Sequence, residues 1–62
     1  MLFRVCRRGA PHRWVVLLGD QLYGEYLTEE QALLDAVEAA TDARTAGQEA
    51  EVWDELRAVR VY

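Results

Sequence analysis

The alternation of apolar and polar positions along the chain predicts short strands arranged around one helix. LFRVCRR, near the N-terminus, alternates loosely and is rich in residues that favour strands, and RWVVLL and QLYGEYL follow as the two arms of a hairpin about Gly19-Asp20. The tripeptide GAP separates the first strand from this hairpin, because proline cannot donate a hydrogen bond to a sheet. Gly24, inside the third strand, indicates a bulge or the close approach of another element.

The helix is predicted from its two ends and from its apolar stripe. Thr28 and Gln31 form a capping box, in which the Thr28 hydroxyl accepts from the Gln31 amide and the Gln31 side chain reaches back. Gly47 supplies a left-handed C-cap. The buried stripe is mostly alanine, so we expect the helix to lie close to its sheet. Its members are Leu33, Ala36, Val37, Ala40 and Ala43, with Asp35, Glu38 and Asp42 on the side that faces water.

The C-terminal segments EAEVWDE and LRAVRVY predict two more short strands around Asp54-Glu55. The fold class is therefore α+β: a single domain with a small antiparallel sheet of four to five strands, in the order β-β-β-α-β-β, and one helix packed on one face. The expected strands are about 2–8, 13–18, 21–27, 49–54 and 57–62, and the expected helix is about 29–46.

One helix can cover only one face of such a sheet. Strand alternation places Phe3 and Val5 on the helix side, and we expect Val59 and Val61 to join them. The opposite face would meet water, a partner or a second copy. It is expected to carry Arg4, Cys6, Arg8, Arg60, Tyr62 and half of the strand 14–18.

Most of the chain resembles a small bacterial family known as domain of unknown function 2188. The shared features are a W-x-V strand, a turn, T-x-x-x-A leading into an alanine-rich helix, a glycine and a final hairpin. The matching residues are Trp14, Val16, Gly19, Thr28, Ala32, Ala36, Ala39, Ala40, Gly47 and Val52. The resemblance implies a fold and no activity or functional residues. Asp54-Glu55 stands where the family has an Asp-Gly turn, so the register of the last strands stays open.

Length and charge narrow the class of protein. A chain of 62 residues buries only about 60% of its unfolded surface, so we expect marginal stability. The single cysteine excludes an internal disulfide, which makes association the expected support. The net charge is −4, with an acidic middle and arginines at both ends. There is neither an apolar run long enough for a membrane span nor a signal-peptide pattern, and we expect a cytoplasmic protein without membrane contact.

The residue types disfavour an enzyme, a metal site and a cofactor. Cys6 and His12 could form a thiol–imidazole pair, but a Gly-Ala-Pro break separates them and no asparagine exists to orient the base. We interpret Cys6 as a small apolar strand residue. The helix acids are dispersed along one side rather than gathered in an oxygen cage. We interpret the acids at 51, 54 and 55 as a polar turn.

The arginines and aromatic residues are the best candidates for an interaction site. The candidates are Arg4, Arg8, Trp14, Trp53, Arg60 and Tyr62. We favour a non-enzymatic module that binds protein, with a homodimer as the first expectation and an unknown protein partner as another. One alternative is a single-stranded nucleic-acid binder that stacks bases on this surface, which the acidic net charge disfavours. Another is an acidic inhibitor or DNA mimic that acts through Asp35, Glu38 and Asp42.

Overall fold

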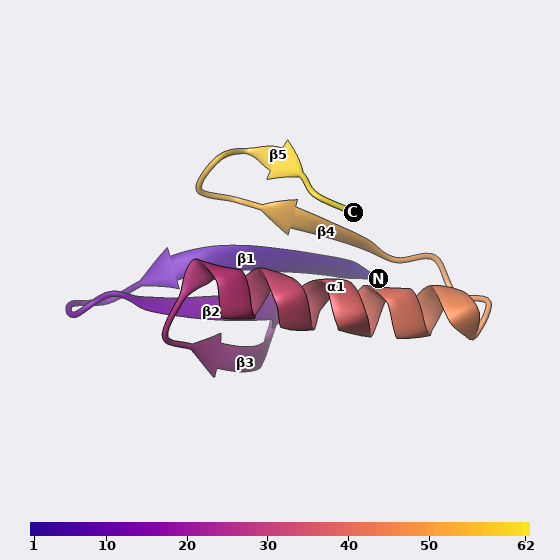
Figure 1. Cartoon of the computed structure of the whole chain (residues 1–62), viewed down its shortest axis with the longest axis horizontal. Coiled ribbons are helices and arrows are strands. Elements are labelled where there is room, and N and C mark those ends of the chain that lie inside the picture. Colours follow the sequence, from indigo (N-terminus) through magenta and orange to yellow (C-terminus); the bar gives the residue numbers. More distant parts are fainter.

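The computed structural model describes all residues 1–62 and shows a five-stranded sheet behind a single helix (Figure 1). The sheet order is β3-β2-β1-β4-β5. The elements are β1 (Leu2–Arg8), β2 (Arg13–Leu18), β3 (Gln21–Tyr26), α1 (Glu29–Thr45), β4 (Glu51–Asp54) and β5 (Val59–Arg60). The predicted α+β class, with its one helix and element order, is confirmed.

The sheet is mixed, so the prediction of a purely antiparallel sheet was wrong. β1 pairs antiparallel with β2, and β2 with β3, but β4 lies parallel to β1 with Phe3 opposite Val52. The chain reverses at each hairpin and again through α1, and β4 therefore starts in the same direction as β1. β1 becomes the central strand, with α1 as the crossover that a parallel neighbour requires.

The helix begins and ends where its sequence signals predict. The Gln31 amide donates to the Thr28 hydroxyl over 3.2 Å. The Gln31 side chain forms no return bond, so only half of the capping box is made. At the other end Gly47 has φ +86°, and its amide donates to the Arg44 carbonyl. A left-handed residue here satisfies carbonyls that the last helical turn leaves free.

The core lies between α1 and one face of the sheet. The largest side chains in it are Phe3 and Val5 from β1, Val16 from β2 and Val52 from β4. The helix contributes Ala32, Ala36, Ala40 and Ala43, while Leu33 and Val37 are only partly buried. The predicted stripe is thus shifted toward its small members. Alanine lets the helix backbone approach the strands, and close packing then depends on the fit of few atoms.

A bulge in β3 brings an aromatic ring over Gly24. The β2–β3 register shifts between Val16 and Leu17, which leaves Tyr23 as the additional residue. A Cβ on Gly24 would lie 2.5 Å from the Tyr26 hydroxyl oxygen. The expected bulge is therefore confirmed, and the close approach comes from the same strand. Burial, helped by the neighbouring Asp35 carboxylate, raises the pKa of Tyr26 to about 12.

The last residues depart from the predicted alternation. Val59 and Val61 are exposed instead of buried under the helix, because β5 has two residues and lies at the sheet edge. Tyr62 lies on the helix side, not on the opposite face. Its hydroxyl is 3.1 Å from that of Thr41, and the Arg44 guanidinium lies 4.0 Å from its ring centroid. Both the Val61 and Tyr62 amides donate to the Val52 carbonyl, which turns the chain back toward α1.

Candidate interaction surface

The face of the sheet opposite α1 has no element packed on it, and we call it the open face. β1 and β2 place on it Leu2, Arg4, Cys6, Arg8, Arg13, Val15 and Leu17, and the rest of the sheet adds Leu22, Glu25, Glu51, Trp53, Glu55 and Arg60. Strand alternation fixes this membership, because these residues face away from Phe3 and Val5. Leu2, Leu22 and Trp53 are 39%, 57% and 36% exposed.

Arg4 crosses the middle of the open face. It stands in register with Leu17 on one side and Trp53 on the other. One guanidinium nitrogen donates to Glu55 and the other to the Gly19 carbonyl, each over 2.9 Å. Both ends of the guanidinium are thus held by the chain itself, and the aliphatic stem lies along the sheet as long cationic side chains do. Two of the five N–H donors of Arg4 are therefore engaged within the chain.

A second set of polar contacts surrounds Trp53. Its indole nitrogen donates to Glu51 over 2.9 Å, and Glu51 also pairs with Arg60 at 3.6 Å. Trp53 helps to line a hollow of about 360 Å³ with Leu2, Arg4, Glu51 and Glu55. The two carboxylates on either side of the indole make this part of the face unfavourable for phosphate and leave the ring available for an apolar contact.

The two apolar residues that β2 places on the open face are more deeply buried than Leu2, Leu22 and Trp53 at the rim of that face. Val15 and Leu17 are 3% and 5% exposed although no helix lies over them. Val15 lies between Cys6 and Glu25 in the register and helps to line a hollow of about 310 Å³ beside the β1–β2 turn. The centre of the open face is therefore largely withdrawn from water, whereas its apolar rim is exposed.

Cys6 and His12 do not form a catalytic pair. The Cys6 thiol lies 3.4 Å from a Glu55 carboxylate oxygen, and His12 is exposed in the β1–β2 turn without a hydrogen bond to it. Burial and the adjacent Glu55 raise the pKa of the Cys6 thiol, although Arg4 and Arg8 act in the opposite direction. A protonated thiol is a poor nucleophile, so this arrangement does not activate Cys6.

The structure separates the predicted interaction residues into two groups. Arg4, Arg8, Trp53 and Arg60 lie on the open face, as the alternation predicts for the arginines. Trp14 and Tyr62 instead pack against the core on the helix side. The Arg7 guanidinium lies 5.9 Å from the Trp14 ring centroid, a position consistent with a cation–π contact. Two of the six candidates are thereby occupied in the fold.

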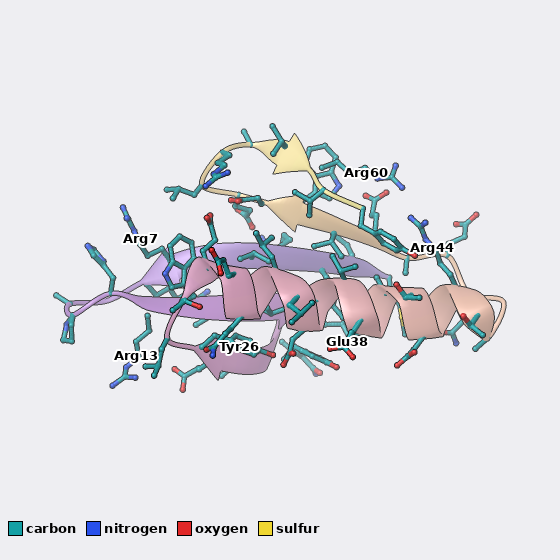
Figure 2. All side chains as sticks on the ribbon, in the orientation of Figure 1. Arg7, Arg13, Tyr26, Glu38, Arg44 and Arg60 are labelled. Atoms are coloured by element: carbon teal, nitrogen blue, oxygen red, sulfur yellow. The ribbon has the colours of Figure 1, made fainter.

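The arginines are spread along the length of the molecule. Arg7 and Arg13 lie at the far end of the β1–β2 hairpin, whereas Arg44 and Arg60 lie toward the other end (Figure 2). The helix acids Asp35, Glu38 and Asp42 are exposed and form no ion pair. They form a solvated helix surface, as predicted, and the acidic docking role stays a prediction.

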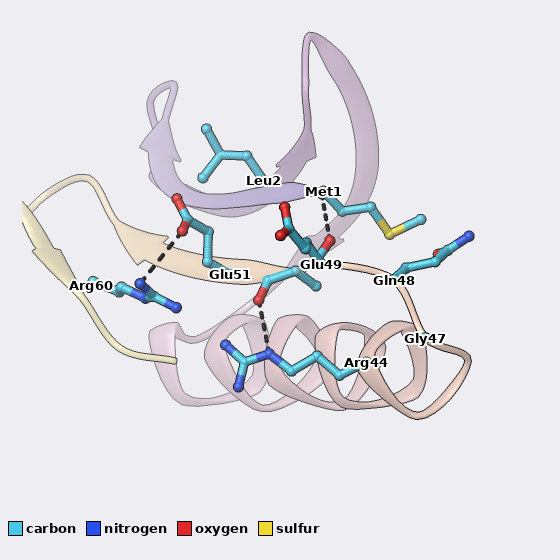
Figure 3. A pocket seen from close by; sticks show the side chains of 9 residues that line it. Met1, Leu2, Arg44, Gly47, Gln48, Glu49, Glu51 and Arg60 are labelled. Carbon is cyan, nitrogen blue, oxygen red and sulfur yellow. Dashed lines mark hydrogen bonds and ion pairs between the residues drawn. The ribbon is translucent and has the colours of Figure 1, made fainter.

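A polar hollow of about 800 Å³ lies where α1 leads into β4. Within it the Arg44 Nε donates to the Ala50 carbonyl, Arg60 pairs with Glu51, and the amino group of Met1 donates to the Glu49 carbonyl (Figure 3). The hollow is lined by both positive and negative groups, and of these Arg60 and Glu51 form an ion pair while Arg44 and the Met1 amino group bind backbone carbonyls. The hollow therefore lacks the single sign of charge that would select a ligand.

Sequence reasoning missed the carboxylates that complete the open face. Glu51 and Glu55 lie on it, whereas Asp54, which we grouped with them as a polar turn, is 1% exposed on the helix side. Alternation along β4 could have separated them, because residues two apart share a face. The pairing of Glu55 with Arg4 depends on the β1–β4 register, which no local signal encodes.

Comparison with family models, curated proteins and solved structures gave no match to the chain. The resemblance to domain of unknown function 2188 accordingly stays a prediction. No group of three or more potential metal ligands is present. None of the molecule's helical structure is both long and apolar enough to cross a membrane.

Proposed function

We propose that the chain is a non-enzymatic interaction module that binds a second copy of itself through the open face. The observation that carries the proposal is the group of exposed apolar residues on that face, Leu2, Leu22 and Trp53, opposite a helix that covers only the other face. Large aromatic residues with apolar neighbours are the residues that contribute most to protein interfaces.

The ion pairs on the open face support a protein partner over a nucleic acid. Arg4 and Arg60 are paired with Glu55 and Glu51 of the same chain. A strand of phosphates bound to these arginines would have to approach the two carboxylates that are paired with them. A second copy can instead place apolar rim against apolar rim in a two-fold arrangement that leaves the internal pairs intact. Binding of single-stranded nucleic acid is therefore the weaker candidate.

The size of the molecule is consistent with such an interface. A stable interface takes about 800 Å² from each partner, which is roughly a fifth of the 4214 Å² accessible surface of this chain. One face of a five-stranded sheet can supply such an area. A small domain also gains from association, because its own core is limited.

Sedimentation velocity over a range of protein concentrations, at low and high salt, tests the proposal. We expect a dimer that survives high salt, because apolar contact drives it. Trp53→Ala and Leu22→Gln are expected to shift the chain to monomer. Leu34→Gln is the matched control, since Leu34 is 62% exposed on the outer surface of the helix; it should leave the dimer unchanged.

A monomer at every concentration would rule out self-association. Equal weakening by Leu34→Gln and Leu22→Gln would place the interface elsewhere. If the wild-type chain is monomeric and binds an oligonucleotide in a salt-dependent manner, the nucleic-acid alternative takes its place.

Cys6 provides an independent readout of the same face. It is the single thiol of the chain and lies beside Arg4 and Glu55. We expect its alkylation rate, followed by mass spectrometry, to fall as protein concentration rises through the dimer range. A rate that is independent of concentration, in a chain shown to dimerise, would show that the dimer leaves the open face uncovered.

A further inference from the structure

Two carboxyl groups lie beside the same arginine at the point where the C-terminal hairpin meets the start of the helix. Glu29 is the first residue of α1, and Asp54 is the last residue of β4. The Asp54 side chain is 1% exposed and that of Glu29 is 19% exposed. Arg57, in the turn that follows β4, lies over both. This site is separate from the open face.

Each carboxyl group uses one oxygen and leaves the other without a partner. Asp54 Oδ1 accepts from the amides of Leu56 and Arg57, over 3.0 and 3.2 Å. Glu29 Oε1 accepts from Arg57 Nη2 over 2.9 Å. Asp54 Oδ2 and Glu29 Oε2 are both buried and accept no hydrogen bond. Arg57 Nε stays 3.8 Å from Asp54 Oδ2, too far for a hydrogen bond.

Two ionised carboxylates cannot satisfy each other, because both are only acceptors. A proton on one of them converts the two unpaired oxygens into a donor and an acceptor. We propose that Glu29 and Asp54 share one proton in the folded chain at mildly acidic pH, and that the resulting hydrogen bond fastens the β4–β5 hairpin to the start of α1 in a pH-dependent manner. Carboxyl pairs of this kind titrate as a unit rather than as separate residues.

The surrounding charges act in both directions. Burial, hydrogen bonding to Asp54 and the Asp54 charge raise the pKa of Glu29, whereas Arg57 from the turn and Arg7 from β1 lower it; the net direction is upward. Glu29 stands in the first helical turn, where the helix dipole alone would favour the charged form. The upward direction therefore has to come from burial and Asp54.

The sign of the pH dependence follows from this direction. A group whose pKa is higher in the folded chain contributes stability that is fully present below its unfolded pKa and is lost as pH rises through the folded pKa. We therefore expect the chain to become more stable as pH falls from neutral through the folded pKa of the pair.

Glu29→Gln tests the proposal, because the amide can donate permanently to Asp54 Oδ2 while its oxygen still accepts from Arg57. At neutral pH and fixed protein concentration, urea unfolding should give a folding equilibrium constant about threefold to tenfold larger than that of the wild-type chain, the value of one neutral hydrogen bond. The rise in stability on mild acidification should disappear. Asp54→Asn, with its amide directed at Glu29, should reproduce both effects.

Glu30→Gln is the matched control. Glu30 lies in the same helical turn, is exposed and has no ion-pair partner. This variant should lose a small amount of stability through the helix dipole and keep the wild-type pH dependence. A Glu29→Gln variant that is destabilised at neutral pH by as much as Glu30→Gln would overturn the proposal, because an ordinary surface carboxylate predicts that result.

Carboxyl NMR titration of the wild-type chain decides the question if a variant fails to fold. Glu29 should titrate at higher pH than Glu30, with a coupled response at Asp54. Glu29 and Glu30 titrating together would also overturn the proposal. The same measurements in a Trp53→Ala background separate this site from self-association, since neither Glu29 nor Asp54 lies on the open face.

Discussion

The two faces of the sheet bury apolar side chains by different means. On the helix side, Phe3, Val5, Val16 and Val52 are at most 2% exposed beneath a row of alanines. On the open face, Val15 and Leu17 are nearly as buried, although no helix lies over them. The helix-side face is covered by α1, whose backbone lies close to the strands. The open face is covered by no other element, and Arg4, which lies beside Leu17, is held there by Glu55.

The difference indicates which of the two faces can rearrange to contact a partner. A face closed by a helix has no adaptable surface, because each alanine fixes the distance between helix and strand. A face closed by Arg4 and its partners can rearrange, since exposed ion pairs contribute little to stability. The open face is therefore the one suited to a partner.

The largest expected effect comes from removing a ring on the helix side. Phe3→Ala should cost about 3–5 kcal/mol of unfolding free energy, because the alanine row cannot collapse into the space. Leu22→Ala on the open face should change it by less than about 0.5 kcal/mol, measured where the chain is monomeric. Urea unfolding followed by circular dichroism compares the two. Similar losses would show that the faces do not differ as described.

Enlarging a buried alanine of the helix should have the next largest effect on stability. Ala40 is fully buried, and Ala40→Leu should destabilise the chain by about 1–3 kcal/mol by pushing α1 from the sheet. Ala46→Leu makes the same change at the exposed C-cap of the same helix and should have almost no effect. The thermal unfolding midpoints of the two variants measure this. If Ala40→Leu were neutral, the helix would not lie as close as the alanine row implies.

Local signals predicted the helix and the first three strands, and nonlocal contacts explain the rest. Thr28 and Gly47 act within one turn of themselves, so their effect could be read directly from the sequence. The parallel pairing of β1 with β4 joins residues such as Phe3 and Val52 that are far apart in the chain. Nothing near either strand specifies that contact.

The two-residue alternation of side chains predicted the correct face of the sheet only for residues inside a continuous strand. It placed Arg4 and Cys6 correctly on β1, a strand of seven residues. It placed Tyr62 on the wrong face, because β5 ends after Arg60 and the backbone turns back to donate twice to Val52. A period of two residues holds for extended backbone alone. The partner of Arg4 was likewise beyond prediction, since Glu55 reaches it through the β1–β4 register.

The smallest expected effect concerns the turn that connects β4, which bears Trp53, to β5. Ala58 has φ +55°, the left-handed region, where an L-residue with a Cβ pays about 1–2 kcal/mol. Asp54 anchors the start of the turn through Leu56 and Arg57, so Ala58 takes the position where a glycine would be expected. Ala58→Gly removes the strain but adds about 0.5–1 kcal/mol of unfolded-state entropy. We expect a net gain of roughly 0.5 kcal/mol.

The same substitution at Ala46 is the control for this prediction. Ala46 has φ −80°, so Ala46→Gly relieves no strain and should lose roughly 0.5 kcal/mol through entropy alone. The opposite signs of the two changes, measured by urea unfolding, would isolate the backbone term, because both residues are exposed and carry only a methyl group. A loss of stability at both positions would mean that the left-handed conformation of Ala58 costs nothing. The β4–β5 hairpin, unlike the rest of the sheet, would then be held by Asp54 and Val52 rather than by its own backbone conformation.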